Sequence, residues 1–529
     1  MRRPANMLVP SGVGVTVALV VVTIVTRLPF ASSMLYSYDS ANYAFAVRDY
    51  YHVGHHHPHP PGYPLYVGSA WLVDRALGDP NRALVLVGIV LSAVAVAATH
   101  RLAVAQHGGA TGLAAALLLL FSTGFWGYGE VAYPYTALAG FGAWIALVSY
   151  RLRHGSTLLA GLSGLLVGVA AGFRWDLLME LGPLWGFQLL RCSWRGWLLA
   201  SAAFGLAVVA WAVPMVQLSG GPAEYLAALR SQSDYVVGAY SVAAGGETIA
   251  RYNADLLFQY LRLVVGAPLL LLVYVLGRTL TPLRVASDGR LRFLLVWLVP
   301  PLAVFFLLHI GDPGYLLVLL PALSILTAVG LADLGGDLGK VARLLASRTS
   351  RSFGLGPRRA ATAAPALILV GLLAWNVNTF LRAPGPTRLP EIRHIDRLLE
   401  TQVAHVRGSL SPSATVILAH DRFRQLQYYL GDYRVVLLFD EYDPTYEQRR
   451  RTLDLPVGTQ ALVVMDSAAV LGPTAAAGSV AVPLYDGPGG TIRVLDTRGA
   501  LAVEYGYGWV ELIGGLAGRD AKSRGRRWL

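Results

Sequence analysis

Residues 82–104 read RALVLVGIVLSAVAVAATHRLAV, and the charged or titratable side chains stand only near the two ends. An α-helix needs about 20 apolar residues to cross the hydrocarbon core of a bilayer. Similar runs recur along the chain, so the sequence predicts a polytopic α-helical membrane protein with about eleven transmembrane helices. The predicted spans are 13–30, 82–104, 109–126, 133–150, 156–173, 175–191, 196–218, 254–277, 292–309, 314–333 and 361–381.

The composition supports this class of protein. The chain has 529 residues, of which 55% are hydrophobic and 14% charged, whereas a soluble domain carries about 25% charged residues. A single cysteine, Cys192, excludes a disulfide framework and any CxxC metal or redox motif. The net charge of +12 fits cytoplasmic loops that face anionic lipid. No compact basic domain with interleaved aromatic residues is present, so no nucleic-acid partner is expected.

The basic residues predict the orientation in the plasma membrane. Two arginines precede the first apolar run and no A-x-A-like cleavage site follows it, so this run is expected to be a retained helix. With the N-terminus in the cytoplasm, most basic loop residues lie inside, among them Arg101, Arg151, Arg191, Arg278 and Lys340. The outer side then has a long first loop (31–81), a second loop (219–253) and the C-terminal region. Within the first loop, 63–78 is too short to span and is expected to lie along the interface.

The composition changes near residue 385. SATVILAH, YRVVLLFD and QALVVMD have the pattern of short β-strands, and RFRQLQYYL, between the first two, has helical character. The sequence therefore predicts a transmembrane module over 1–384 and a small extracytoplasmic α/β domain over 385–529. This domain either captures substrate or covers the active site, or it is a structural cap without chemistry.

An acidic residue directly after the first predicted span is the first candidate for chemistry. Asp39 lies in LYSYDSANYAFAVRDYY, where Tyr43 is one of several neighbouring tyrosines. An ionisable group at a membrane boundary is a functional candidate. The alternative is structural, because Asp39 or Ser40 has the residue type that caps a helix over Asn42–Tyr51.

Further polar side chains lie at the outer ends of later spans. Glu130 lies among aromatic residues in FWGYGEVAYPYTA, where it either orients a sugar hydroxyl or points outward from an interfacial belt. Arg174 and Asp176, in GFRWD, either bind substrate or pair with each other. His309 and Tyr315 flank the turn IGDPG; both side chains donate hydrogen bonds that suit a phosphate, although the turn also reads as a plain hairpin.

Residues 55–64 read HHHPHPPGYP, in which histidine density suggests a metal and proline density suggests a stiff segment. Zinc sites need fixed geometry and an ordered second shell, and consecutive histidines point in different directions. Asp39 and Asp49 are ten residues apart and form no evident acidic ligand cluster. We therefore expect no metal or other cofactor, and we expect Pro58, Pro60 and Pro61 to hold the chain extended.

These motifs, in this order, resemble the polyprenyl-phosphate-dependent glycosyltransferases of the GT-C superfamily. The likeness is to the branch of the protein O-mannosyltransferases and aminoarabinose transferases. It covers most of the chain, and DSxNY with HPPGYPLY is its most specific part. An EVxY-like segment after the third span and a GY turn before a late span add to it. Two departures concern the substrate: Asp39 is followed by Ser40 where many members have glutamate, and the late turn has His309 as its nearest cationic candidate where lysine or arginine is common.

The resemblance implies the function and the roles of individual residues. It implies transfer of a sugar from a polyprenyl-phosphate-linked donor to a protein, glycolipid or polysaccharide acceptor. Asp39 would be the general base of an inverting displacement. His59 and Tyr63 would form one wall of the pocket opposite Asp39, and His309 and Tyr315 would contact the phosphate, with Arg174 as a further candidate; Tyr43 and Glu130 complete the predicted substrate-binding set.

Two other classes of function compete with this hypothesis. One is a transporter or flippase for a lipid-linked or small polar substrate, in which internal repeats and mid-membrane charges are common. The sequence has no clear repeat, and its notable charges lie at span ends on one side, which favours surface chemistry. The other is a non-catalytic scaffold for envelope assembly, which predicts that replacing Asp39 is harmless.

Overall fold

The computed structural model describes residues 12–152, 155–279, 285, 287–348, 357–419 and 422–437, and the strand residues 452–454, 461–464, 472–475, 493–496, 501–505 and 508–513. The chain divides into two compact units. The membrane unit comprises Met1–Ala31 and Ala46–Glu391, and the C-terminal unit comprises Ser32–Phe45 and Ile392–Leu529. Residues 32–45 thus belong to the same unit as the C-terminal residues, although residues 46–391 separate the two parts in the sequence.

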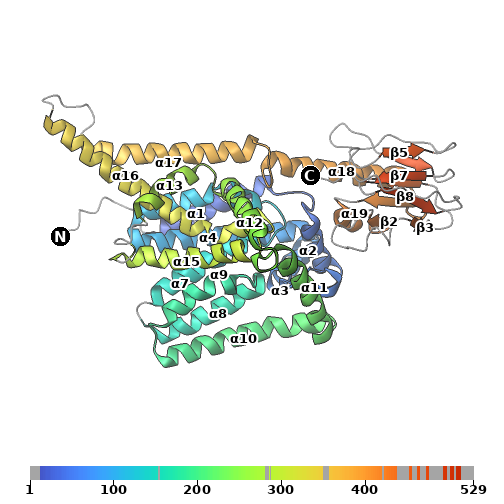
Figure 1. Ribbon diagram of the computed structural model, residues 1–529, viewed down its shortest axis with the longest axis horizontal. Helices are drawn as coiled ribbons and strands as arrows, with labels where there is room; N and C mark the ends of the chain where they lie inside the picture. Colours follow the sequence, from blue (N-terminus) through green and yellow to red (C-terminus); the bar gives the residue numbers. More distant parts are fainter. Residues whose placement is uncertain are drawn as a thin grey trace. The chain divides into compact units, whose positions relative to one another are not determined.

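Within the described residues the membrane unit is helical (Figure 1). Its α-helices are α1 (Gly12–Arg27), α3 (Pro64–Leu77), α4 (Pro80–His107), α5 (Gly109–Leu120), α6 (Thr123–Tyr128), α7 (Tyr135–Leu152), α8 (Thr157–Phe173), α9 (Leu177–Leu189), α10 (Trp194–Leu218), α11 (Pro222–Tyr240), α12 (Val242–Val265), α13 (Pro268–Thr279), α15 (Gly289–Leu307), α16 (Leu320–Arg348) and α17 (Pro357–Arg382). Three short 3-10 helices join them: η1 (Leu28–Phe30), η2 (Val53–His55) and η3 (Pro313–Val318). Helix α2 (Tyr38–Arg48) begins in the C-terminal unit and ends in the membrane unit.

Every predicted span coincides with helical structure in the described residues, which confirms the polytopic helical class. Six of the described helices are long and apolar enough to cross a membrane, or seven if the bent pair α12–α13 forms one span. The total of eleven spans stays a prediction. The helical prediction for RFRQLQYYL is matched by α19 (Phe423–Tyr429), and residues 63–78 form α3, whose expected place along the interface stays a prediction.

Two predicted spans are wrong as single straight helices. The segment 109–126 is interrupted between α5 and α6, where the Ser122 hydroxyl donates a hydrogen bond of 2.6 Å to the Val264 carbonyl oxygen. The segment 254–277 bends by 116° between α12 and α13. Gly266 adopts a positive φ of 69° at this bend and Pro268 begins the next helix, which is a favourable place for proline.

Helix α10 runs along α8, and glycines permit this close approach (Figure 1). The α8 sequence GLSGLLVG places Gly164 and Gly168 four residues apart on the contact face. A methyl group at Gly164 would clash with the Ala200 carbonyl oxygen, and one at Gly168 would lie 2.7 Å from the Ala207 Cβ. Small residues spaced in this way let membrane helices pack backbone against backbone, where lipid tails supply little hydrophobic driving force.

The C-terminal unit has α18 (Leu389–Ser409) over most of its length, η4 (Pro412–Ala414), α19 and two four-stranded sheets. In the first sheet the strand order is β2-β1-β4-β6, with β1 parallel to β2 and β4, and β6 antiparallel to β4. In the second the order is β3-β8-β7-β5. The strands are β1 (Thr415–Ala419), β2 (Arg434–Leu437), β3 (Thr452–Asp454), β4 (Ala461–Val464), β5 (Gly472–Ala475), β6 (Arg493–Asp496), β7 (Leu501–Tyr505) and β8 (Gly508–Ile513). The three strands predicted from sequence are β1, β2 and β4.

Candidate functional site

A buried arginine surrounded by tyrosines is the main polar feature of the membrane unit. Arg174 follows α8 directly, and its side chain is 3% exposed. The centre of its guanidinium lies 5.4 Å from the Tyr63 ring centroid, 4.9 Å from that of Tyr135 and 5.0 Å from that of Tyr315. Aromatic faces attract a cation, and the attraction grows when water is excluded. We call these four residues the Arg174 cage.

Two carboxylates share the positive charge of Arg174. The Arg174 Nε donates a 3.1 Å hydrogen bond to Asp176, and Nη2 donates another to the same carboxylate. Glu180, one helical turn after Asp176, is fully buried. Neither of its carboxylate oxygens has a hydrogen-bond partner among the described residues. The pairing of Arg174 with Asp176, one of the two alternatives from sequence, is therefore present, and it uses Nε and Nη2 of Arg174.

The turn between α15 and η3 presents one wall of the cage. The Asp312 carboxylate accepts a hydrogen bond of 2.7 Å from the Gly314 amide and another from the Tyr128 hydroxyl. The first bond caps η3, on which Tyr315 lies. The second connects the turn to α6. The connection is thus more than a plain hairpin, because its carboxylate fixes the backbone that carries Tyr315 to Arg174.

His309 lies beside the cage, next to Tyr315 and Tyr240. Its ring centroid is 6.2 Å from that of Tyr315 and 5.0 Å from that of Tyr240 in α11. Burial lowers the pKa of His309 below its usual value of 6.5, because a charged imidazole is costly away from water. The contact of His309 with a phosphate stays a prediction. Arg174 is the buried guanidinium of this site, and the imidazole of His309 is a further hydrogen-bonding group beside Tyr315.

The proline-rich loop contributes to the cage through its last residues. His59 Nε2 lies 3.1 Å from the Tyr63 hydroxyl, and Tyr63 faces Arg174. The earlier histidines fold back on themselves: the backbones of His52 and His57 form an antiparallel bridge, and the rings of His52 and His55 stack at 3.8 Å. Among the described residues no group of three or more His, Cys, Asp or Glu side chains gathers as a metal site. The structure thus separates His59 from the rest of the run.

Gly62 has no space for a side chain, and we therefore expect Gly62→Ala to be strongly destabilising. Its φ is +122°, and an added Cβ would lie 2.6 Å from the Tyr51 hydroxyl oxygen and 2.9 Å from the Met215 sulfur. The Tyr51 hydroxyl donates a 2.6 Å hydrogen bond to the Gly62 carbonyl, so it cannot move away without losing that bond. Strain and overpacking together predict a loss of about 2 kcal/mol or more.

The midpoint of thermal unfolding of the purified protein measures this effect. Gly68→Ala in α3 is the matched control, because nothing lies within 4 Å of the added Cβ. It should be neutral, or stabilising by up to about 1 kcal/mol from helix propensity. Equal midpoints for the two variants would contradict the expected strain at Gly62.

Glu130 does not point outward from an interfacial belt, which was one of the two alternatives from sequence. It is fully buried, and its carboxylate interacts electrostatically with Arg27, which is also fully buried. Arg27 donates a 2.7 Å hydrogen bond to the Leu120 carbonyl oxygen and lies over the Trp126 ring at 5.2 Å. Arg27 is absent from the predicted site residues. Its place inside an apolar run is nevertheless a signal of a functional residue, because a charge there is costly unless an opposite charge compensates it.

Asp39 and Tyr43 belong to the C-terminal unit. The helix that carries them, α2, begins at Tyr38 rather than at Asn42. Its cap is the Ser37 hydroxyl, which accepts a 3.1 Å hydrogen bond from the Ser40 amide. The prediction that Asp39 or Ser40 caps this helix is therefore wrong. Asp39 lies instead in the first turn, where the helix dipole favours a negative charge; it is partly exposed, and Tyr43 is 1% exposed.

Comparisons with known proteins find matches to solved structures and none to family models or curated sequences. No protein-family model matches the chain, and no curated protein sequence matches it. The apo crystal structure of ArnT from Cupriavidus metallidurans has a TM-score of 0.58 at 14% identity, covering 92% of this chain and 98% of that one. The structure of that protein bound to undecaprenyl phosphate has a TM-score of 0.56 at 13% identity, with 92% and 97% covered. An apo oligosaccharyltransferase from Archaeoglobus fulgidus has 0.51 at 10% identity, with 92% and 74% covered.

The chain is therefore a polytopic helical membrane protein that shares its fold with these solved structures. More particularly, it has the fold of ArnT over nearly the full length of both chains.

Proposed function

We propose that the protein is a membrane glycosyltransferase of the polyprenyl-phosphate-dependent type. It moves a sugar from a polyprenyl-phosphate-linked donor to a hydroxyl of a protein, glycolipid or polysaccharide on the extracytoplasmic face. The observation that carries the proposal is the fold shared over 92% of the chain with ArnT, one structure of which is bound to undecaprenyl phosphate. The resemblance of the DSxNY and HPPGYPLY motifs supports it independently.

The Arg174 cage is the proposed site for the donor phosphate. The leaving phosphate gains negative charge as the sugar departs, so positive charge and hydrogen-bond donors aimed at it lower the barrier. Arg174 supplies the charge and Nη1 for a hydrogen bond, and the hydroxyls of Tyr63 and Tyr315 supply further donors. His59 holds Tyr63, and His309 is a further hydrogen-bond donor beside Tyr315. Glu130, whose carboxylate compensates the charge of Arg27, stays a proposed contact of the substrate.

Asp39 is the proposed general base. The acceptor hydroxyl is a weak nucleophile until a base takes its proton as the new bond forms. In a single displacement the acceptor attacks the anomeric carbon from the face opposite the phosphate, so the configuration inverts. The oxygen–hydrogen bond of the acceptor breaks, its proton goes to the Asp39 carboxylate, and the sugar–phosphate bond breaks with both electrons leaving on the phosphate. Tyr43, one turn later on α2, is a proposed contact of the substrate.

Donor consumption by the purified protein tests the proposal. The protein in lipid vesicles is incubated with a panel of polyprenyl-phosphate sugars and a mixed acceptor fraction, and released polyprenyl phosphate is measured by mass spectrometry. One donor should be consumed, with a product anomer opposite to that of the donor by NMR. Retained configuration would contradict the single displacement. Donor that crosses the bilayer unconsumed would support a transporter instead, and no consumption of any donor would end the glycosyltransferase proposal.

Cysteine labelling tests the proposed extracytoplasmic location. Gly238 in α11 and Gly336 in α16 are exposed, and a side chain at either has open space within 4 Å. With Cys192 replaced by serine, Gly238→Cys should react with a membrane-impermeant maleimide in intact cells. Gly336→Cys, on the opposite side by the basic-residue distribution, should react only after permeabilisation. The reverse pattern would overturn the orientation.

A further inference from the structure

The segment that carries Asp39 is built into the core of the C-terminal unit. Met34 is 9% exposed and belongs to one apolar cluster with side chains of α18, β1 and α19, and Leu35 is fully buried. The described members of this cluster besides Met34 include Leu398, Leu399, Val406, Ile417, Leu426, Leu430 and Tyr433. Met34 and Leu35 are therefore buried residues of this unit, and a buried core side chain fixes the backbone that carries it.

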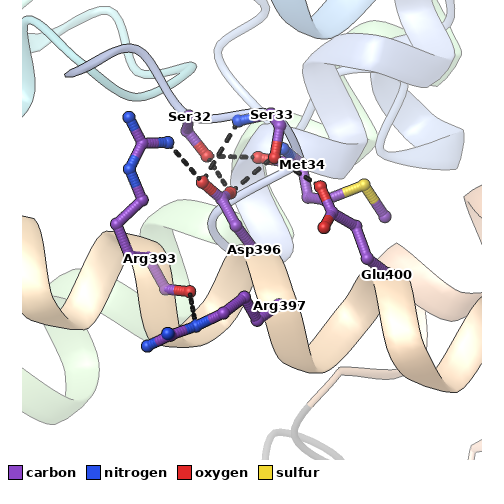
Figure 2. Close-up of polar contacts among 7 residues, drawn as sticks. All are labelled: Ser32, Ser33, Met34, Arg393, Asp396, Arg397 and Glu400. Carbon is purple, nitrogen blue, oxygen red and sulfur yellow. Dashed lines mark hydrogen bonds and ion pairs between the residues drawn. The ribbon is translucent and has the colours of Figure 1, made fainter. Parts of the chain in front are cut away.

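Asp396 in α18 holds the backbone at the start of the segment (Figure 2). Its carboxylate is 2% exposed and accepts hydrogen bonds from the Ser33 amide at 3.2 Å and the Met34 amide at 3.1 Å. The Ser32 hydroxyl lies 2.6 Å from the same carboxylate and 2.6 Å from the Met34 carbonyl oxygen, and donates its one proton to either. Arg393 balances the charge at 3.1 Å. A carboxylate that accepts two backbone amides in a buried place is a strong and specific anchor.

Residues of α19 hold the segment further along the chain. The Leu35 amide donates a 2.8 Å hydrogen bond to the Tyr429 hydroxyl oxygen. Beyond Asp39, the Arg424 Nε donates a 2.7 Å hydrogen bond to the Asn42 side-chain oxygen, and its guanidinium lies 4.9 Å from the Phe45 ring. Arg424 is itself 9% exposed. The segment is therefore anchored on both sides of Asp39. Asp396 and Tyr429 bind residues that precede Asp39 in the chain, and Arg424 binds a residue that follows it.

We propose that the C-terminal unit positions the general base: Asp396, Tyr429 and Arg424 hold residues 32–45 so that Asp39 keeps the geometry that proton transfer needs. This inference rests on the proposed role of Asp39. It gives the C-terminal unit a part in catalysis in place of the alternatives from sequence, which were substrate capture, covering of the active site and a structural cap without chemistry. Displacement of a catalytic group by about 1 Å is enough to lower a rate by about 100-fold, so anchors that never touch substrate have a large effect on turnover.

Hydrogen exchange tests the anchoring without any need for activity. In Asp396→Ala, the exchange of the Ser33 and Met34 amides should rise at least about 10-fold, because both lose their acceptor. Glu400→Ala is the matched control: Glu400 lies one turn further along α18, is exposed, and accepts a 2.7 Å hydrogen bond from the Ser33 hydroxyl alone (Figure 2). It should leave both amides protected. Unchanged exchange of β1 amides shows that the unit stays folded.

Kinetics of the same variants test the positioning. Asp396→Ala should lower kcat by about 10- to 100-fold with the donor KM within about threefold, because Asp396 is not one of the residues of the proposed phosphate site. Asp396→Asn, which keeps an oxygen acceptor, should restore part of kcat, and Glu400→Ala should keep all of it. If Asp396→Ala does not fold, Tyr429→Phe replaces it, since it removes one hydroxyl acceptor and should deprotect the Leu35 amide selectively while lowering kcat.

Failure of the proposed function and failure of the positioning role give different results. Wild-type protein that consumes no donor contradicts the proposed function, whatever the exchange data show. Protein that turns over donor and depends on Asp39, but keeps its kcat when the Ser33 and Met34 amides are deprotected, overturns the positioning role. Amides that stay protected in Asp396→Ala overturn the anchor itself.

Discussion

Asp39→Asn is expected to lower the rate of sugar transfer by about 10²- to 10⁴-fold, the contribution of a well-placed general base. Asparagine has nearly the same shape but cannot take the acceptor proton. The change removes one negative charge from the first turn of α2, where the interaction with the helix dipole is worth about 0.3–1 kcal/mol. The effect on folding should therefore be small beside the effect on rate, and the donor KM should change little.

Initial rates of polyprenyl phosphate release, with thermal unfolding measured on the same preparations, check this expectation. Asp49→Asn is the control, because Asp49 is a nearby exposed carboxylate whose ion pair with Arg48 at 2.7 Å lies at the surface, and exposed pairs are worth about 0–1 kcal/mol. It should keep the full rate. An Asp39→Asn protein as active as Asp49→Asn would remove Asp39 from the mechanism and favour a scaffold.

Arg174→Gln is expected to abolish donor binding and to destabilise the fold together. Without Arg174, the buried carboxylate of Asp176 loses its ion-pair partner and Glu180 loses a neighbouring positive charge. Breaking one side of a buried pair costs about 3–5 kcal/mol. The phosphate would also lose the only guanidinium that the described part of the chain places over the rings of Tyr63, Tyr135 and Tyr315. Turnover should fall by at least about 100-fold.

A second variant separates stability from binding. Arg174→Gln combined with Asp176→Asn removes both charges of the pair, so it should recover most of the thermal stability and none of the donor turnover. Arg174→Lys keeps the charge but loses the planar fork and the stacking on tyrosine rings, and should bind donor weakly. Recovered turnover in the double variant would show that Arg174 serves the fold and not the phosphate.

The membrane class and the helical segments could be predicted from sequence because both depend on local composition. A run of about 20 apolar residues has few other stable arrangements. The breaks at Ser122 and Gly266 could not be predicted, since the first depends on a hydrogen bond to Val264, far along the chain. The environment of His309 could not be predicted either. Its residue type suggests a cation, but burial among other elements lowers the pKa of this side chain.

The sequence by itself determined which side chains carry polar chemistry at the ends of apolar helices, because such residues are costly there and stand out from their surroundings. Only the tertiary structure decided how they combine. It gathered Tyr63, Tyr135, Arg174 and Tyr315, from four separate segments, around one guanidinium, and it joined residues 32–45 to α18 and α19 through Asp396 and Tyr429. Such contacts depend on long-range packing, in which each partner is chosen by the shape and polarity of elements far away in the chain.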